Sequence, residues 1–533
     1  MGFFHIIRTP DYVKVQTEDG WQALGRDGGT VWTSGGIDVL TGTSGDGELV
    51  LSISSTIETI KRVSFRWSES IEADMLYLGD HWERAYGDLE WRGLTPERIF
   101  PWYFLAYDGR YTSGYGVKTN PSAFCFWQAD TAGVTLTADI RCGGLGVSLR
   151  GRTLQIATVT AKTGSENESP FSFMKRFCAA LCDKPLMPDF PVYGGNNWYY
   201  AYGKSTEVEI LNDSERVSTL ASSLENRPFM VLDAGWQEIF VAGNTCSGGP
   251  WYRGNRDFPD MAALAGKMDG LGVRPGIWCR PLLTVEKVME SWLLPTGRFP
   301  QRSYEGEVLD PSIPDVLEHI KNDMRRFTGW GYQLIKHDFS TFDIFGRWGM
   351  RMGCQLTEDN WCFSDRSKTT AEIIMDVYRA IREASNPAIV IGCNTVGHLG
   401  AGYFHVNRIG DDTSGREWQR TRKMGVNSLA FRMAQHGAFY AVDGDCVGLT
   451  KDIPWYFNKQ WLQLLSESGT PLFVSAAPDA AGPEQEAALK AAFATAATNV
   501  PPAEPLDWLY NMVPSKWRLN QEEVAFDWYG KEG

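Results

Sequence analysis

The segment YQLIKHDFST, Tyr332–Thr341, combines the pattern of a buried strand with a polar end. Its apolar residues have strand character, and a buried strand is ordinarily followed by turn residues such as Gly, Asn or Pro. Here the strand ends instead in a cation, an imidazole and a carboxylate, Lys336, His337 and Asp338. Reactive side chains at the carboxyl ends of strands are typical of a (β/α)8 barrel. The segment therefore predicts that Asp338 stands at the mouth of such a barrel.

The chain from about residue 191 repeats the order strand, polar loop, helix. The predicted strands are PVYGGNNW (191–198), FMVLDAG (229–235), RPGIWC (274–279), YQLIKHD (332–338), AIVIGC (388–393), HVNRIG (405–410), FYAVDGD (439–445) and PLFVSA (471–476). Helical patterns lie between most of them, at 213–224, 260–268, 315–327, 368–384, 420–435 and 484–497. About eight such units match a (β/α)8 TIM barrel. A doubly wound open sheet is the alternative, but no GxGxxG motif follows the first strand.

The chain up to about Thr163 has a different pattern. Short β-branched runs alternate apolar with polar residues between Gly-rich turns, which predicts an antiparallel β-sandwich. We therefore expect four parts, an N-terminal β-sandwich at 1–165, a helical linker at 166–190, a (β/α)8 barrel at 191–500 and a C-terminal β segment at 501–533. The last part has the pattern of the first strands of a truncated second sandwich.

Composition and charge argue against several kinds of partner. The 51 Lys and Arg residues against 65 Asp and Glu residues give a net charge of −14, which disfavours a nucleic-acid or anionic-membrane surface. No apolar run approaches the roughly 20 residues of a membrane span, and the N-terminus lacks a signal-peptide pattern. Because no CxxC, HExxH, Walker or GxSxG motif is present, we expect no metal and no cofactor. A cytoplasmic protein is expected, or a secreted one if a leader has been removed.

Polar and aromatic residues gather where the predicted barrel strands end. Parallel strands place their carboxyl ends on one face, so residues that follow different strands lie close together there. These residues are Asp233, Trp236, Trp278, Lys336, Asp338, Asn394, Arg408, Asp411, Asp412 and Asp443. A lone Asp after a strand is often a helix cap or turn former, Trp278 would also suit a core, and His337 is expected to be a packed side chain. Two carboxylates from different strands, with cations beside them, nonetheless match a retaining glycosidase.

Five motifs resemble one family in their order and spacing. They are GDHWERAYGDLEW (79–91), VLDAGW (231–236), RPGIW (274–278), LIKHDF (334–339) and NRIGDDTSGREW (407–418). The chain is thereby similar to glycoside hydrolase family 36, the α-galactosidase-like enzymes of clan D, over nearly its whole length. The first motif resembles part of that family's N-terminal sandwich, and KHDF together with RIGDDT is fairly specific.

The resemblance implies a retaining double displacement at an α-glycosidic bond. Asp338 matches the nucleophile, which would form a covalent β-glycosyl intermediate. Asp412 matches the general acid/base, and its neighbour Asp411 is the rival for that role. A second carboxylate beside the acid/base is expected to raise its pKa, which would suit proton donation near neutral pH.

The remaining predicted site residues are expected to bind the sugar. The resemblance implies that Lys336 binds ring hydroxyls, that Arg408 approaches the 2-position and that Trp278 stacks on the ring. Asp233 matches the first of two aspartates that bind the 4- and 6-hydroxyls in galactose-specific members. The other substrate-binding residues that we predict are Trp236, Asn394, Asp411 and Asp443.

One departure from the family bears on the sugar. The family commonly has Asp-Asp-Gly-Trp after the second strand, whereas Ala234 replaces the second carboxylate here. Losing a charged hydrogen bond to a hydroxyl costs roughly 1.5–3 kcal/mol. Galactose, N-acetylgalactosamine and a pentopyranose without C6 are therefore all open as the natural sugar.

The sequence thus predicts an exo-acting α-glycosidase for terminal α-galactosides or closely related sugars, with an oligosaccharide or glycoside as its partner. Three alternatives stay open, a galactosyl transferase of the raffinose-synthase type, a catalytically silent carbohydrate-binding protein and a metal-dependent hydrolase that uses the carboxylates as ligands. In this family the sandwich can lend an aromatic side chain to a neighbouring subunit. A homo-oligomer in which Trp82 or Trp91 lines the pocket would follow that pattern.

Overall fold

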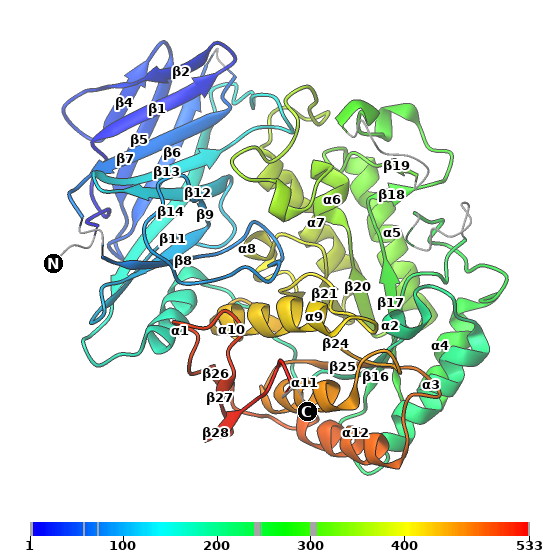
Figure 1. Cartoon of the computed structure of the whole chain (residues 1–533). Coiled ribbons are helices and arrows are strands. Elements are labelled where there is room, and N and C mark those ends of the chain that lie inside the picture. The colour runs from blue at the N-terminus through cyan, green and yellow to red at the C-terminus, as the bar shows by residue number, and fades with distance from the viewer. Residues whose placement is uncertain are drawn as a thin grey trace.

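The N-terminal part of the chain forms a β-sandwich of antiparallel sheets (Figure 1). The computed structural model describes residues 4–56, 59–71, 74–238, 246, 248–298 and 306–530. One sheet has the order β2 (Gly20–Ala23), β1 (Tyr12–Thr17), β7 (Arg62–Ser68), β13 (Gly133–Asp139), β12 (Phe124–Asp130) and β9 (Phe100–Pro101). The other has the order β3 (Gly25–Arg26), β4 (Val31–Ser34), β5 (Ile37–Thr43), β6 (Leu49–Ser55), β14 (Thr153–Thr163), β11 (Thr112–Val117), β10 (Tyr103–Tyr107) and β8 (Leu76–Gly79). Every second side chain of β6 is buried, as the sequence pattern predicts for a strand with one face in the core.

The barrel is built from parallel strands. Their order in the described residues is β23 (Ala441–Asp443), β22 (Val406–Arg408), β21 (Ile389–Gly392), β20 (Leu334–His337), β17 (Arg274–Cys279), β16 (Phe229–Leu232), β15 (Tyr193–Asn196), β25 (Leu472–Ala476) and β24 (Cys446–Leu449). The outermost strands of this order, β23 and β24, are consecutive in the chain, and only Gly444 and Asp445 separate them. They are two halves of one strand, broken where Asp445 adopts a positive φ of 76°. The sheet therefore closes on itself, and the predicted TIM-like barrel is confirmed.

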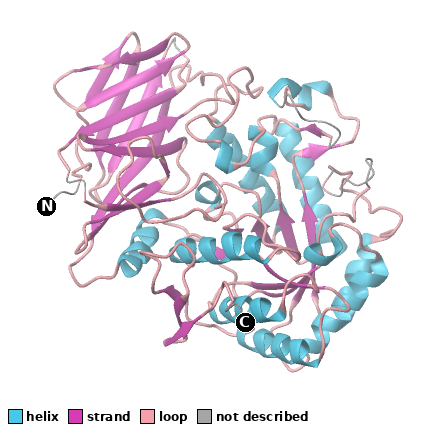
Figure 2. Cartoon of the chain, in the orientation of Figure 1, coloured by secondary structure: helices cyan, strands magenta, loops and turns pink. Residues whose placement is uncertain are grey.

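Helices cover the outside of the barrel (Figure 2). The longer ones are α3 (Glu207–Leu220), α4 (Met261–Gly270), α5 (Pro314–Trp330), α7 (Thr370–Ser385), α11 (Trp455–Glu467) and α12 (Pro483–Ala496). Helix α5 illustrates why they form, because its buried Val316, Ile320, Met324 and Phe327 recur on one face. The helix predicted at 420–435 is present as a chain of short pieces. These are α9 (Trp418–Arg420), the π-helix η4 (Thr421–Asn427), α10 (Ser428–Arg432) and the 3-10 turn η5 (Met433–Gln435).

The remaining elements complete the described part of the chain. They are α1 (Pro170–Leu181), which follows the sandwich, α2 (Trp198–Ala201), β18 (Leu283–Thr284), η1 (Glu290–Trp292), η2 (Thr296–Arg298), β19 (Glu307–Val308), α6 (Ser340–Phe345), η3 (Gly349–Arg351) and α8 (Gly397–Gly400). Strands β26 (Glu504–Pro505), β27 (Lys516–Leu519) and β28 (Glu522–Ala525) pair into a small antiparallel sheet near the C-terminus. A membrane-spanning helix is absent from the described residues, because every helix there is too short or too polar for one.

One of the segments through which the sandwich contacts the barrel is Gly79–Trp91, which we call the bridging segment. Its residue Ala85 donates its N–H to Ile409 O at 2.8 Å and accepts the N–H of Asp411 at 2.9 Å. The side-chain amide of Asn427 in η4 donates to Leu89 O at 2.8 Å. The bridging segment therefore pairs with the chain directly after barrel strand β22, at the end of the barrel where the predicted site lies.

Trp82 and Trp91 of the bridging segment are core residues of this chain. Trp82 is 2% exposed, and its ring centroid lies 5.2 Å from that of Trp102 and 5.6 Å from that of Phe124. Trp91 is 7% exposed and packs edge-on against Trp508. The expectation that either ring reaches the pocket of another subunit is therefore wrong, because both rings are already enclosed by their own chain.

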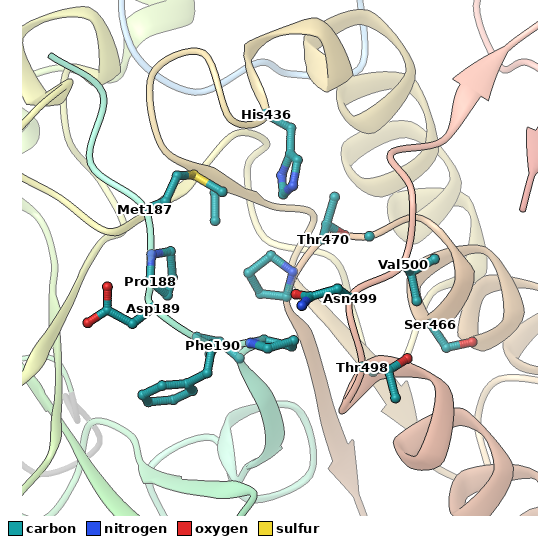
Figure 3. Close-up of a pocket in the computed structure, with 16 residues that line it drawn as sticks. Met187, Pro188, Asp189, Phe190, His436, Ser466, Thr470, Thr498, Asn499 and Val500 are labelled. Carbon is teal, nitrogen blue, oxygen red and sulfur yellow. The ribbon is translucent and has the colours of Figure 1, made fainter. Parts of the chain in front are cut away.

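Two cavities open at the opposite end of the barrel. One, of about 170 Å³, is lined by Met187, Pro188, His436 and Thr470 among others (Figure 3). The other, of about 560 Å³, is lined among others by Arg274 and Ile389, the first residues of β17 and β21. No predicted site residue lines either cavity. These cavities therefore do not mark the predicted site.

Replacing Trp82 with Ala should lower the free energy of unfolding by about 3–5 kcal/mol, because the change removes a large ring from a closely packed aromatic core. It also removes the hydrogen bond that Trp82 Nε1 donates to Gly353 O at 2.8 Å. Trp21, which is 48% exposed, provides the matched control. Its replacement with Ala should change the free energy of unfolding by no more than about 0.5 kcal/mol. Urea unfolding followed by fluorescence compares the two, and equal losses would contradict the packing assigned to Trp82.

Candidate active site

The strand register explains why the predicted residues meet. Trp278 is paired with Lys336 between β17 and β20, and Arg408 is paired with Asp443 between β22 and β23. Asp233 and Asp338 directly follow β16 and β20. Since all these strands are parallel, their carboxyl ends bring the polar side chains to one end of the barrel.

Asp338 is held in one orientation by hydrogen bonds to both of its oxygens. Trp278 Nε1 donates to Oδ2 at 3.0 Å, while the backbone N–H groups of Phe339 and Asn394 donate to Oδ1 at 2.7 and 3.2 Å. Phe339 has a positive φ of 63°, so the chain turns sharply after the carboxylate. Asp338 is 8% exposed. A carboxylate that is fixed in orientation and only slightly exposed to solvent is suited to act as a nucleophile towards a single atom of a bound molecule.

Lys336 and Asp233 form a largely buried ion pair beside Asp338. Lys336 Nζ lies 2.7 Å from Asp233 Oδ2, which also accepts the side-chain amide of Asn196 at 2.7 Å. Burial lowers the pKa of the Lys336 ammonium, but the carboxylates of Asp233 and Asp338 outweigh it and raise that pKa well above its ordinary value. Lys336 is therefore a permanent cation and a hydrogen-bond donor at the centre of the carboxylates.

Asp411 and Asp412 occupy different surroundings although they are adjacent. Both oxygens of Asp411 face arginines, with Arg84 Nη2 3.2 Å from Oδ1 and Arg420 Nη2 2.7 Å from Oδ2. Asp412 differs, because the ion pairs that it forms with described residues all involve one oxygen, Oδ1. This oxygen lies 2.9 Å from Arg408 Nη2 and 3.7 Å from Arg84 Nη1. The side chain of Asp412 is 39% exposed and that of Asp411 is 17% exposed. Asp412 is thus the more accessible of the two.

The expectation of a raised pKa for Asp412 is wrong. Desolvation does raise the pKa of this carboxyl, but the positive charges of Arg408, Arg84 and Lys336 outweigh it and hold the pKa below its ordinary value. The neighbouring carboxylate of Asp411 does not reverse this direction, because Arg84 and Arg420 are paired with it. In the unliganded protein Asp412 therefore loses its proton at a lower pH than an ordinary aspartic acid.

Asp445 is a buried residue that we did not include among the predicted site residues. Its Oδ2 accepts hydrogen bonds from Arg408, from Tyr199 and, at 2.7 Å, from the N–H of Thr413. The predicted Asp443 lies behind it, where Oδ1 accepts the N–H of Asp445 at 2.9 Å. Burial raises the pKa of Asp443, and Arg408 opposes this shift. Asp445 therefore holds the Arg408 side chain in place. Asp443 stabilises the backbone at the break between β23 and β24, through its hydrogen bond with the N–H of Asp445.

The predicted tryptophans have little exposed surface. Trp278 is 1% exposed, so the structure does not support the expected stacking of a sugar on its ring. It orients Asp338 instead. Trp236 is fully buried, donates its Nε1–H to Trp278 O at 2.9 Å and packs against Phe327 of α5. Asn394 is also fully buried, and its Oδ1 accepts the N–H of Phe342 at 3.1 Å.

Two charged residues of the bridging segment were missed by the sequence reasoning. Arg84 contacts Asp411 and Asp412, and the Glu83 carboxylate accepts hydrogen bonds from Asn394, from Tyr86 and, at 2.8 Å, from Gly349 N. Both are almost fully buried. The motif that contains them was noted for its similarity to the sandwich, and the adjacent charges between its tryptophans were the available signal.

The comparison with solved structures identifies the fold. The α-galactosidase TtGalA from Thermus thermophilus, in complex with p-nitrophenyl α-D-galactopyranoside, matches with a TM-score of 0.62 and 16% identity over 97% of this chain and 99% of that one. The family 36 α-galactosidase AgaA from Geobacillus stearothermophilus, as a variant in complex with raffinose, matches with a TM-score of 0.63 and 14% identity over 96% and 79%. The chain has the fold of the family 36 α-galactosidases. Neither a protein-family model nor a curated protein sequence matches it.

His337 should make the protein less stable in acid. It is fully buried, packs edge-on against Tyr378 and Phe404, and its burial lowers its pKa to about 3. An unfolded histidine titrates near 6.5, so this contribution to stability is complete above about pH 6.5 and is lost as the pH falls towards 3. Between pH 6.5 and 3 the unfolding free energy of the wild type falls as the pH falls. We expect this slope to be smaller in His337→Phe by about 1.4 kcal/mol per pH unit. Urea unfolding at several pH values measures the slope.

The matched control for this experiment is His5→Phe, because the His5 side chain is 78% exposed. It should leave the slope close to that of the wild type. A His337→Phe slope equal to the wild-type slope would contradict the assignment of His337 as a buried neutral group.

Proposed function

We propose that this protein is a retaining exo-acting α-glycosidase that hydrolyses terminal α-galactosides or closely related sugars. The observation that carries the proposal is the arrangement of Asp338 and Asp412 at one end of the barrel, with Lys336 acting electrostatically on both carboxylates. The similar folds of TtGalA and AgaA, which were solved with p-nitrophenyl galactoside and raffinose, support the same class of sugar.

In the proposed first step, Asp338 is the nucleophile. Its carboxylate attacks the anomeric carbon and forms an ester bond as the bond from that carbon to the glycosidic oxygen breaks. Asp412 gives its proton to the departing oxygen, so the aglycone leaves as a neutral alcohol. The fixed hydrogen bonds to Asp338 support this role, because they hold the attacking group without having to reorganise.

In the second step, Asp412 acts as a base. It removes a proton from water as the water oxygen attacks the anomeric carbon, and the ester bond to Asp338 breaks. Two inversions at one carbon give a product with the original α configuration. The exposed side chain of Asp412 supports its choice over Asp411, whose two oxygens are both engaged by arginines.

Asp233 and Lys336 would bind ring hydroxyls in this proposal, as an acceptor after β16 and a donor at the end of β20, two strands that flank β17. Arg408 lies close enough to Asp412 to contact a substituent near the reacting carbon. Ala234, which is 1% exposed, supplies no polar side-chain atom where the family commonly has a second aspartate. The bound sugar therefore loses one charged contact.

We expect Asp338→Ala to abolish hydrolysis of every active aryl α-glycoside, because no other group would form the ester. Asp412→Asn should lower kcat/KM, which reports the first step alone, about 10²–10⁴-fold for a phenyl leaving group, which needs a proton, and far less for 2,4-dinitrophenyl, which does not. Asp411→Asn, the matched control, should lack this dependence on the leaving group. Steady-state rates with both glycosides measure the three variants.

Trapping with a 2-fluoro-glycosyl fluoride gives an independent test of the covalent step. The mass of the wild-type protein should increase by one glycosyl unit, located on a peptide that contains Asp338, and Asp338→Ala should show no increase. Equal hydrolysis by Asp338→Ala and wild type would overturn the proposal.

The consequence of Ala234 can be measured with a panel of aryl glycosides of α-galactose, α-N-acetylgalactosamine, β-L-arabinopyranose and α-glucose. Ala234→Asp restores the missing carboxylate and should raise kcat/KM for α-galactoside at least about tenfold relative to β-L-arabinopyranoside, which lacks the 6-hydroxyl. Ala234→Ser is the matched control, with a smaller expected gain. An unchanged ratio in Ala234→Asp would contradict a role of position 234 at the 6-hydroxyl.

A further inference from the structure

The bridging segment is anchored to two different strand ends of the barrel. Glu83 is 3% exposed, and its carboxylate accepts hydrogen bonds from Asn394, which follows β21, and from Tyr86. Two residues further on, Ala85 pairs through its backbone with Ile409 and Asp411, which follow β22. Arg84 lies between these anchors, so the backbone on either side of it is fixed to the barrel.

The side chain of Arg84 is buried between an aromatic ring and two carboxylates. It is 5% exposed, and its guanidinium carbon lies 5.2 Å from the centroid of the Trp348 ring. The Trp348 ring is in turn stacked on Phe342, with centroids 4.5 Å apart. Two guanidinium nitrogens then face the two adjacent carboxylates, Nη2 towards Asp411 at 3.2 Å and Nη1 towards Asp412 at 3.7 Å.

We propose that Arg84 of the N-terminal sandwich is a positioning residue for Asp412, holding the Asp411 and Asp412 carboxylates apart so that Asp412 faces the glycosidic oxygen. This inference rests on the proposed function for the identity of the reaction. It assigns to the sandwich a part of the site, because the guanidinium of Arg84 contacts both carboxylates, whereas Arg408 contacts Asp412 and Arg420 contacts Asp411.

The same position gives Arg84 an electrostatic effect on Asp412. The groups that face or electrostatically influence Asp412 in the described residues are Arg84 of the bridging segment, Lys336 of β20, Arg408 of β22, Asp411, Arg420 of α9, Tyr199 of α2 and Cys246. The arginines and the lysine lower the pKa of Asp412. Removing Arg84 therefore raises that pKa, both directly and because Asp411 loses one of its two cations.

The test compares Arg84→Met with the wild type. The proton-donating form of Asp412 should persist to higher pH in the variant, so the alkaline limb of the kcat/KM profile should move up by roughly one pH unit. Arg152→Met is the matched control, because Arg152 also joins the sandwich to the barrel, through Glu372 at 2.7 Å, but lies away from the carboxylates. Its alkaline limb should coincide with that of the wild type. An unshifted limb in active Arg84→Met would overturn the inference.

Arg84→Lys provides a second test that does not depend on the Met variant folding. A lysine keeps the charge but lacks the fork that contacts both carboxylates. We expect kcat/KM, which reports the first step alone, to fall at least about tenfold for phenyl glycosides and less than about twofold for 2,4-dinitrophenyl glycosides, because only the former need a positioned acid. Equal losses for both leaving groups would indicate a merely structural role and overturn the inference.

A direct titration separates this inference from the proposed function. If the wild type hydrolyses no aryl glycoside, the proposed function fails. The carboxyl pKa of Asp412 can still be measured by NMR with ¹³C-labelled aspartate, assigned from the signal that Asp412→Asn removes. A pKa that rises in Arg84→Met supports control of Asp412 by Arg84, and an unchanged pKa overturns it.

Discussion

Charges buried at the carboxyl ends of the barrel strands have to be paired, and this constraint organises the site. Removing one partner from such a pair leaves an uncompensated charge at a cost of about 3–5 kcal/mol. Asp233 is therefore paired with Lys336, and Asp445 with Arg408. Each pairing has a second effect, because it directs a cation towards the position between the carboxylates where a sugar would lie.

The same constraint explains why the sandwich is joined so closely to the barrel. Arg408 of the barrel already serves Asp445 and Asp412, so the adjacent Asp411 needs cations from elsewhere. Arg84 supplies one of them from the bridging segment. The hydrogen bonds of Glu83 and Ala85 then fix the backbone on either side of Arg84. The sandwich is in this respect a part of the candidate site and not a separate module attached to it.

Local patterns predicted the fold well, and they predicted less of the site. Each of the eight predicted barrel strands is present, because each was marked by a short apolar run, whereas β24, the second half of the broken strand, was not predicted. The break at Asp445 and the role of Arg84 depend on contacts between residues far apart in the chain. The direction of the Asp412 pKa shift was missed for that reason, since Arg84 is more than three hundred positions away in the sequence. Trp278 shows a related limit, because sequence places it at the mouth but does not reveal that its indole N–H is used by Asp338.

The low pKa of Asp412 is compatible with catalysis if charge is considered over the whole proposed reaction. Forming the ester removes the negative charge of Asp338, while proton donation creates one on Asp412. The summed charge of the two carboxylates therefore stays nearly constant during the step. Lys336 interacts with both carboxylates, so its electrostatic stabilisation is kept. Cations that stabilise the Asp412 anion favour the step in which the aglycone leaves, and the loss of the Asp338 charge accompanies it. In the second step the negative charge returns to Asp338, where three N–H groups are already aligned to receive it. The arrangement therefore stabilises one negative charge on either carboxylate, so that the charge can shift from Asp338 to Asp412 in the first step and back in the second.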